Sequence, residues 1–247
     1  MKRVKLIVAY DGTNYHGWQT QPNAVTIEEV LNHHLSELLK EEIKVIGASR
    51  TDAGVHALGN VAVFDTSARM PADKISYALN TRLPEDIRIQ DSCEVPSDFH
   101  PRFQKTTKTY EYRILNRRFP DPTRRLNSFF YYYPLDVVKM QEASLYLVGE
   151  HDFKSFCSNP QMKKSTVRIV DAIEIVRKKD YIYFNFHGTG FLQNMVRILV
   201  GTLLEVGRGF WEPEQVQAIL RKERSDHTGI GIKNVNDRLK IYFGPAY

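Results

Sequence analysis

Two short segments carry side chains that could do chemistry, and both mix polar residues with glycines. Residues 10–19 read YDGTNYHGWQ and residues 47–57 read GASRTDAGVHA, and each follows a stretch that is predicted to be a strand. Loops after strands often hold functional groups. The second segment contains the carboxylate of Asp52, although an aspartate in a loop with glycines is ordinarily a turn or capping residue. Taken alone, this local context favours the structural role.

The residues around these segments predict a β-α-β-β-α-β order. An alternating pattern predicts a strand over residues 5–10, and a capping box of Thr26 and Glu29 opens a helix. The buried face of that helix is predicted to comprise Ile27, Val30, Leu31, Leu35, Leu38 and Leu39. The unit is completed by strands at 43–46 and 60–64, a helix from residue 71 and a strand at 87–95. This order is typical of the ferredoxin-like split unit.

A similar order recurs after about residue 105. Its predicted elements are strands at 107–115 and 129–133, a helix from Asp136, paired strands at 167–177 and 181–187, and a helix from Phe191. The chain is therefore predicted to be an α+β protein with two ferredoxin-like halves, residues 1–105 and 106–247.

The segment at residues 116–127 (NRRFPDPTRRLN) interrupts the second half with four arginines and two prolines. The prolines indicate a loop. Its arginines are candidates for contacts with nucleic-acid phosphates, but they could equally form a solvated charge run. Both interpretations stay open for Arg117, Arg118, Arg124 and Arg125.

Composition favours a globular, cytoplasmic protein. The chain has 247 residues and 42% hydrophobic residues, which suffices for a packed core. Its N-terminus lacks the features of a signal peptide, and the apolar window at residues 191–206 is interrupted by polar side chains, so no membrane span is expected. Cys93 and Cys157 are too few for a disulfide framework and are interpreted as small core residues. The net charge of +5 is compatible with a polyanionic partner but does not require one.

Five segments resemble, in order and spacing, the motifs of the TruA family of tRNA pseudouridine synthases. Besides the two segments described above, they are KTYEYRI (108–114), HDFKSFC (151–157) and GTGFLQNMVRILVG (188–201). The resemblance extends from about residue 3 to about residue 224. It implies a pseudouridine synthase fold of two ferredoxin-like halves, a homodimer, and a tRNA substrate that is modified in its anticodon stem-loop. It also implies neither a metal ion nor an organic cofactor.

The resemblance assigns Asp52 the catalytic role. Conversion of uridine to pseudouridine breaks the bond between ribose C1′ and N1, turns the base, and joins C1′ to C5, so the sugar carbon becomes electron-deficient. A carboxylate can stabilise or capture that carbon. An ionised carboxylate in a pocket that excludes water needs a cationic partner, and Arg197 in the last motif is the match, although it could instead be a snorkelling helix arginine.

Further residues are assigned to substrate handling. The target uridine must swing out of its stem, and Arg50 is matched to the side chain that supports the opened stack. Tyr110 is matched to the tyrosine that stacks on the base and could move the C5 proton, although strand tyrosines are usually packing residues. Two additional candidates for RNA contact are His100 and Arg102. No histidine cluster has the sequence spacing of a metal site.

The C-terminal segment departs from the family pattern. From Asp226 it reads DHTGIGIKNVNDRLKIYFGPAY, which resembles a glycine box of sensor histidine kinases without the other nucleotide-binding boxes. Helical spacing is predicted there for Ile232, Val235, Leu239 and Tyr242. The leading hypothesis is a tRNA uridine isomerase, and the alternatives are a non-catalytic RNA-binding protein of the same fold and, more weakly, a nucleotide-binding fragment. The intact Asp52 argues against the RNA-binding alternative.

Overall fold

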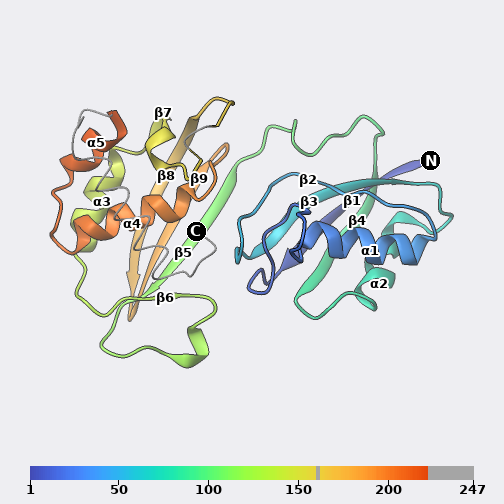
Figure 1. Cartoon of the computed structure of the whole chain (residues 1–247), viewed down its shortest axis with the longest axis horizontal. Helices are drawn as coiled ribbons and strands as arrows, with labels where there is room; N and C mark the ends of the chain where they lie inside the picture. The colour runs from blue at the N-terminus through green and yellow to red at the C-terminus, as the bar shows by residue number, and fades with distance from the viewer. Residues whose placement is uncertain (160–161, 222–247) are drawn as a thin grey trace. The chain divides into compact units, whose positions relative to one another are not determined.

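The computed structural model describes residues 1–159 and 162–221, and the chain divides into two compact units (Figure 1). The first unit is Met1–Gln104, and the second begins at Lys105. Each unit contains one β-sheet with helices packed on it, so the predicted α+β class is confirmed. Among the described residues, no helix is long and apolar enough to cross a membrane.

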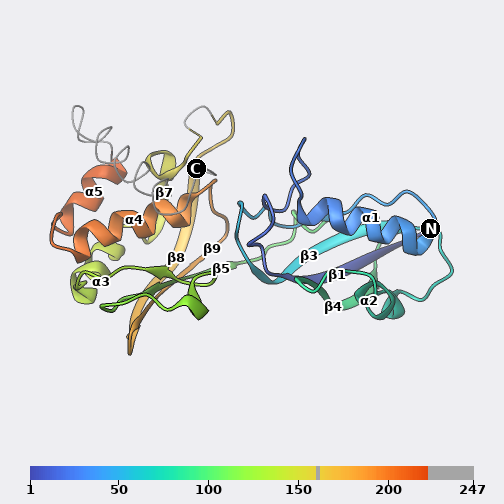
Figure 2. The same cartoon turned by 60° about the horizontal axis from the view of Figure 1, so that its bottom comes forward.

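The first unit has the predicted β-α-β-β-α-β order. Its elements are β1 (Lys2–Tyr10), α1 (Ile27–Leu39), β2 (Ile46–Gly47), β3 (Ala57–Thr66), α2 (Ala72–Asn80) and β4 (Ile87–Val95). The strands lie in the order β2-β3-β1-β4, and every neighbouring pair is antiparallel. Helix α1 lies along the sheet in both views (Figure 1, Figure 2). Alternate residues of β1 are buried because one face of this sheet packs on the helices.

Helix α1 begins and packs as its sequence predicts. The Thr26 side chain accepts a hydrogen bond from the backbone N–H of Glu29 at 3.4 Å. The fully or nearly buried face comprises Ile27, Leu31, Leu35 and Leu39, and partly buried Val30 and Leu38 pack beside it. The apolar periodicity therefore identified the helix face correctly.

The strand predicted at residues 43–46 was wrong in its bounds, since β2 contains only Ile46–Gly47. Backbone N–H groups that would pair with a neighbouring strand in a longer β2 instead donate to side chains of α1. The N–H of Ile43 donates to Ser36 Oγ at 2.9 Å, and the N–H of Val45 donates to Asn32 Oδ1 at 2.8 Å. Ile43 and Val45 are buried, but their N–H groups bond to the helix rather than to the sheet.

The second unit has a five-stranded sheet in the order β6-β5-β9-β8-β7. Its elements are β5 (Lys108–Leu115), β6 (Phe129–Phe130), α3 (Val137–Leu145), β7 (Gly149–Asp152), β8 (Val167–Lys178), β9 (Tyr181–Gly188), α4 (Met195–Gly207) and α5 (Glu214–Arg221). Two short 3₁₀ turns occur at Pro122–Arg124 and Phe153–Phe156. All strand pairs are antiparallel except β5 with β6, which is parallel.

Several other sequence predictions need comment. Helix α4 begins at Met195 rather than Phe191, because Asn194 adopts a left-handed conformation with φ of 56°. The short strand β7 and helix α5 were not predicted. Cys157 is buried as expected, whereas Cys93 is only half-buried. The C-terminal segment from Asp226, with its predicted helical spacing, lies outside the described residues.

Candidate active site

The two polar segments pack against each other in the first unit. We call residues 11–19, between β1 and α1, the support loop, and residues 48–56, between β2 and β3, the aspartate loop. Just before Asp52, the carbonyl of Thr51 accepts a hydrogen bond from the N–H of Trp18 at 3.1 Å. Just after it, the N–H of Gly54 donates to the carbonyl of Tyr15 at 3.1 Å. Backbone hydrogen bonds therefore hold the aspartate loop on both sides of Asp52.

Side chains reinforce this attachment. The hydroxyls of Thr51 and Tyr10 share a hydrogen bond of 2.8 Å. Trp18 is fully buried, which indicates a packing role in the support loop. At the base of the aspartate loop, the Asn60 side chain accepts from the N–H of Ser49 at 3.3 Å and donates to the Ser49 carbonyl at 3.0 Å. The loop is consequently fixed at its base and in its middle.

Two glycines of the support loop permit this close approach. Gly17 has φ of +85°, and a Cβ at this position would lie 2.4 Å from the carbonyl oxygen of Thr51. A Cβ at Gly12 would lie 2.1 Å from the carbonyl oxygen of Val55. Only a residue without a side chain lets the two backbones come so close.

His56 ends the aspartate loop and has two partners on the support loop. Its Nδ1 accepts a hydrogen bond from the N–H of Gly12 at 3.1 Å and lies 2.9 Å from Asp11 Oδ1. Partial burial acts to raise the pKa of Asp11, but hydrogen bonds from Thr13 and the nearby His56 outweigh it and lower this pKa. Nδ1 must lack a proton to accept from Gly12 and must carry one to donate to Asp11. Both contacts use Nδ1, so this one nitrogen joins the end of the aspartate loop to the support loop.

The other predicted site residues of the first unit differ in their surroundings. Asp52 is half-buried, whereas Arg50 is exposed on the same loop. Arg102 lies at the start of this loop, because its Nε donates to the Gly47 carbonyl at 2.9 Å. His100 accepts from the N–H of Arg102 at 3.2 Å and stacks on Phe103, with ring centroids 4.2 Å apart. The structure thus brings His100 and Arg102 to the base of the aspartate loop.

Tyr110 and Arg197 both belong to the second unit. Tyr110, on β5, pairs with Phe186 of β9, and its ring meets Phe191 edge-on at a centroid distance of 5.1 Å. Arg197 is half-buried on α4, a helix that contacts β5. Burial raises the pKa of Tyr112, and the nearby Arg197 guanidinium acts in the opposite direction. Because that pKa is raised, Tyr112 is poorly suited to proton transfer.

The arginine-rich loop makes several contacts within itself and with Asp180. Arg117 lies 3.8 Å from an oxygen of Asp121 and 3.5 Å from one of Asp180, and its Nε donates to the Phe119 carbonyl at 2.8 Å. The Arg118 guanidinium lies over the Phe119 ring, 5.0 Å from its centroid. The exposed side chains in and beside this loop include Arg118, Arg124, Arg125, Phe119, Tyr132 and Tyr133.

Two sets of contacts were not predicted from the sequence. One joins His56 to Asp11 and Gly12, and the other joins Thr51 to Tyr10 and Trp18. All six residues stood within or at the edge of the two marked segments. Their pairing depends on how β1 and β3 lie beside each other, and the register joins Tyr10 to Ala57. These contacts could have been predicted only if the pairing register of β1 with β3 had been known.

Comparison with known proteins identifies the family. The sequence model of the family described as "tRNA pseudouridine synthase" matches residues 6–104 and 143–245, and the second match includes most of the C-terminal segment. The chain therefore belongs to the tRNA pseudouridine synthase family, as its five motifs predicted.

Named relatives agree with this assignment. The chain is 46% identical over 232 residues to tRNA pseudouridine synthase A of Thermoanaerobacter sp. (strain X514), with 94% of each chain covered. It is 44% identical over 229 residues to tRNA pseudouridine synthase A of Acetivibrio thermocellus, with 93% of this chain and 94% of that protein covered. One chain of a solved H/ACA RNP bound to a substrate RNA aligns with 82% of this chain and 53% of its own length. The TM-score of 0.34 and the identity of 13% are low, so this similarity is weak.

Proposed function

We propose that this protein isomerises uridine to pseudouridine in the anticodon stem-loop of tRNA, with Asp52 as its catalytic carboxylate. The observation that carries the proposal is the attachment of the aspartate loop by backbone hydrogen bonds before and after Asp52. A catalytic group must be held in a productive position before the substrate arrives. Relatives named tRNA pseudouridine synthase A, aligned over 94% of the chain, support the choice of reaction.

The reaction is an exchange of bonds within one nucleotide. The bond from C1′ to N1 breaks while the Asp52 carboxylate stabilises or attacks the electron-deficient C1′. The base then turns and C5 bonds to C1′. A proton leaves C5, and N1 gains one, so that substrate and product have the same composition. We assign Tyr110 to stacking on the base and to movement of the C5 proton, and Arg197 to pairing with the Asp52 carboxylate.

The remaining assignments concern the RNA. Arg50, exposed beside Asp52 on the aspartate loop, is assigned to support of the stack after the uridine leaves it. RNA contacts are assigned to His100 and Arg102 at the base of that loop. Phosphate contacts are assigned to four residues of the arginine-rich loop: Arg117, Arg118, Arg124 and Arg125. We further propose that the protein is a cytoplasmic homodimer. The reaction is proposed to need neither a metal ion nor an organic cofactor. Sedimentation of the purified protein tests the oligomeric state.

The test is turnover of an unmodified tRNA transcript by wild-type protein and by Asp52→Asn. The amide keeps the shape of the side chain but lacks its charge, so we expect loss of pseudouridine formation with tRNA affinity nearly unchanged. Asp91→Asn, at an exposed position of β4, is the matched control and should retain activity. Residual turnover of Asp52→Asn within about tenfold of wild type would remove Asp52 from this role. Binding without any product from wild type would favour the non-catalytic alternative.

A further inference from the structure

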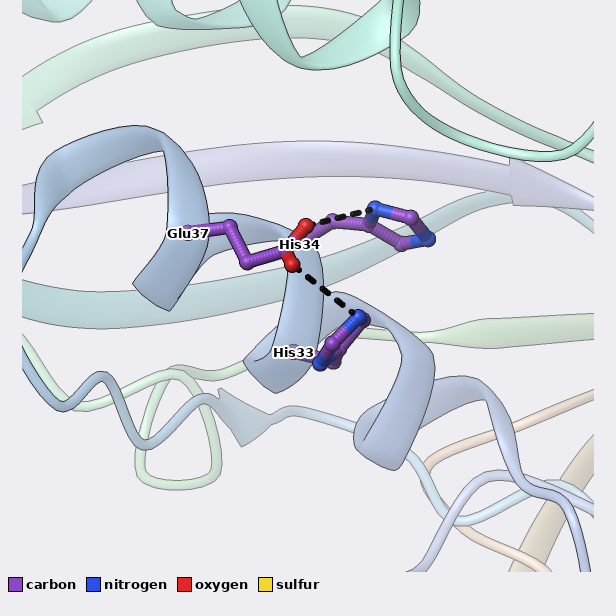
Figure 3. Close-up of side chains that lie close together, drawn as sticks. All are labelled: His33, His34 and Glu37. Atoms are coloured by element: carbon purple, nitrogen blue, oxygen red, sulfur yellow. Dashed lines mark ion pairs between the residues drawn. The ribbon is translucent and has the colours of Figure 1, made fainter.

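Three side chains with metal-ligand atoms lie together on helix α1 (Figure 3). The carboxylate of Glu37 lies between the imidazole rings of His33 and His34. Its Oε1 is 3.6 Å from His33 Nε2, and its Oε2 is 3.9 Å from His34 Nδ1. One ligand atom from each residue lies within 4.8 Å of the other two. The four-residue spacing of His33 and Glu37 places them on one helix face, and the ring of the intervening His34 turns toward the same carboxylate.

Hydrogen bonding alone does not explain this arrangement. Both nitrogen–oxygen distances exceed the range of a good hydrogen bond. Within the part of the chain that the structure describes, His34 Nδ1 is a buried atom without a hydrogen-bond partner. A buried polar atom left in this state is destabilising.

The same distances suit two ligands of one ion. Zinc bonds to nitrogen and oxygen are about 2.0–2.2 Å long, so two ligands of a tetrahedral ion are separated by about 3.4 Å. The observed 3.6 and 3.9 Å exceed this separation by a few tenths of an ångström and end on different oxygens of Glu37, and all three ligand atoms lie within 4.8 Å of one another, so the side chains must close around the ion. Long, exposed side chains such as Glu37 can make this adjustment by small rotations.

We propose that His33, His34 and Glu37 bind a divalent transition-metal ion of the zinc class. Two imidazole nitrogens and one carboxylate oxygen form the protein ligands, and water completes the coordination. No residue of this trio belongs to the support loop or the aspartate loop, so the proposal is independent of the isomerase chemistry. An ion held across one turn of α1 binds only the folded helix and therefore stabilises the first unit.

The test is calorimetric titration of the full-length, chelator-treated protein with zinc chloride. We expect one zinc ion per chain, and we expect Glu37→Gln to weaken binding by at least about tenfold. Glu37 is exposed, so this variant should remain folded, which circular dichroism checks. His187→Ala removes a histidine of the second unit that lies outside the trio and should leave the affinity unchanged.

Cobalt provides a second readout. Substitution with Co²⁺ should give the visible absorption of a four-coordinate ion in wild type and not in Glu37→Gln. Zinc should also raise the melting temperature of wild type more than that of Glu37→Gln. The proposal is overturned if wild type does not bind zinc, if Glu37→Gln binds it equally well, or if His187→Ala loses as much affinity as Glu37→Gln.

Discussion

Gly17 allows a direct test of the idea that the support loop positions Asp52. In Gly17→Ala the new residue keeps a left-handed backbone with φ of +85°, which costs about 1–2 kcal/mol for a residue with a side chain. Its Cβ would also lie 2.4 Å from the Thr51 carbonyl oxygen, and relief of such overpacking costs about 1–3 kcal/mol. We therefore expect a total loss of about 2–5 kcal/mol in the free energy of unfolding.

Two other glycines separate these contributions. Gly209 has φ of +76°, and a Cβ there would have no neighbour within 4 Å, so Gly209→Ala should show only the backbone cost. Gly12→Ala should show only the contact cost, because its Cβ would lie 2.1 Å from the Val55 carbonyl oxygen while its φ is not positive. Gly17→Ala should consequently destabilise the protein more than Gly209→Ala does.

The assays are urea unfolding and turnover under saturating tRNA, followed by release of tritium from C5 of labelled uridine. Displacement of a catalytic group by about 1 Å can lower the rate about 100-fold. We expect Gly17→Ala and Gly12→Ala to lower kcat in this way at temperatures where they remain folded, and Gly209→Ala to keep wild-type kcat. The reasoning fails if Gly17→Ala keeps wild-type kcat, or if it is no less stable than Gly209→Ala.

Three further predictions concern the substrate and pH. Tyr110→Phe should bind tRNA normally but form product slowly. Tyr110→Ala should in addition lose base stacking, which is worth about 1–3 kcal/mol in binding. Equal rates for Tyr110→Phe and wild type would leave Tyr110 with a packing role only. The second variant replaces the four arginines of the loop by glutamine: Arg117, Arg118, Arg124 and Arg125. The slope of log tRNA affinity against log salt concentration should become shallower, by about 0.7–0.9 for each phosphate that the variant no longer neutralises. An unchanged slope would show that these arginines are a solvated charge run that does not contact tRNA. Because the folded-state pKa of Asp11 is lowered, its ionised form stabilises the protein above the ordinary carboxyl pKa, and this contribution is lost as pH falls through the lowered value. The stability difference between wild type and Asp11→Asn in urea should therefore shrink between pH 7 and about pH 3.

The fold could be predicted where local pattern and tertiary packing agree. Strand β4 (Ile87–Val95) has its predicted bounds, and α1 buries its predicted face. Prediction failed where side chains replaced backbone partners, as at Ile43 and Val45, whose N–H groups bond to Ser36 and Asn32. The four-residue strand β7 is too short for an alternating pattern to distinguish it from a loop.

The candidate site was predicted as two segments but not as one assembly. Each segment stood out by its own residue types, and five motifs identified the family. Their contact arises because β1 ends where β3 begins, with Tyr10 opposite Ala57. The loop that leaves β1 and the loop that enters β3 therefore meet at one end of these two central strands. Strand register is a long-range property that neither segment encodes by itself.

The two interpretations of Asp52 concern different atoms of the same residue. An aspartate in a loop with glycines is typically a turn residue, and the Asp52 carbonyl does accept a hydrogen bond from the N–H of Val55 at 3.2 Å. That bond is made by the backbone carbonyl and not by the carboxylate. Hydrogen bonds of Thr51 and Gly54 to the support loop then determine where the turn lies. A turn at Asp52 is compatible with the proposed catalytic role of its carboxylate, because neighbouring residues position the loop.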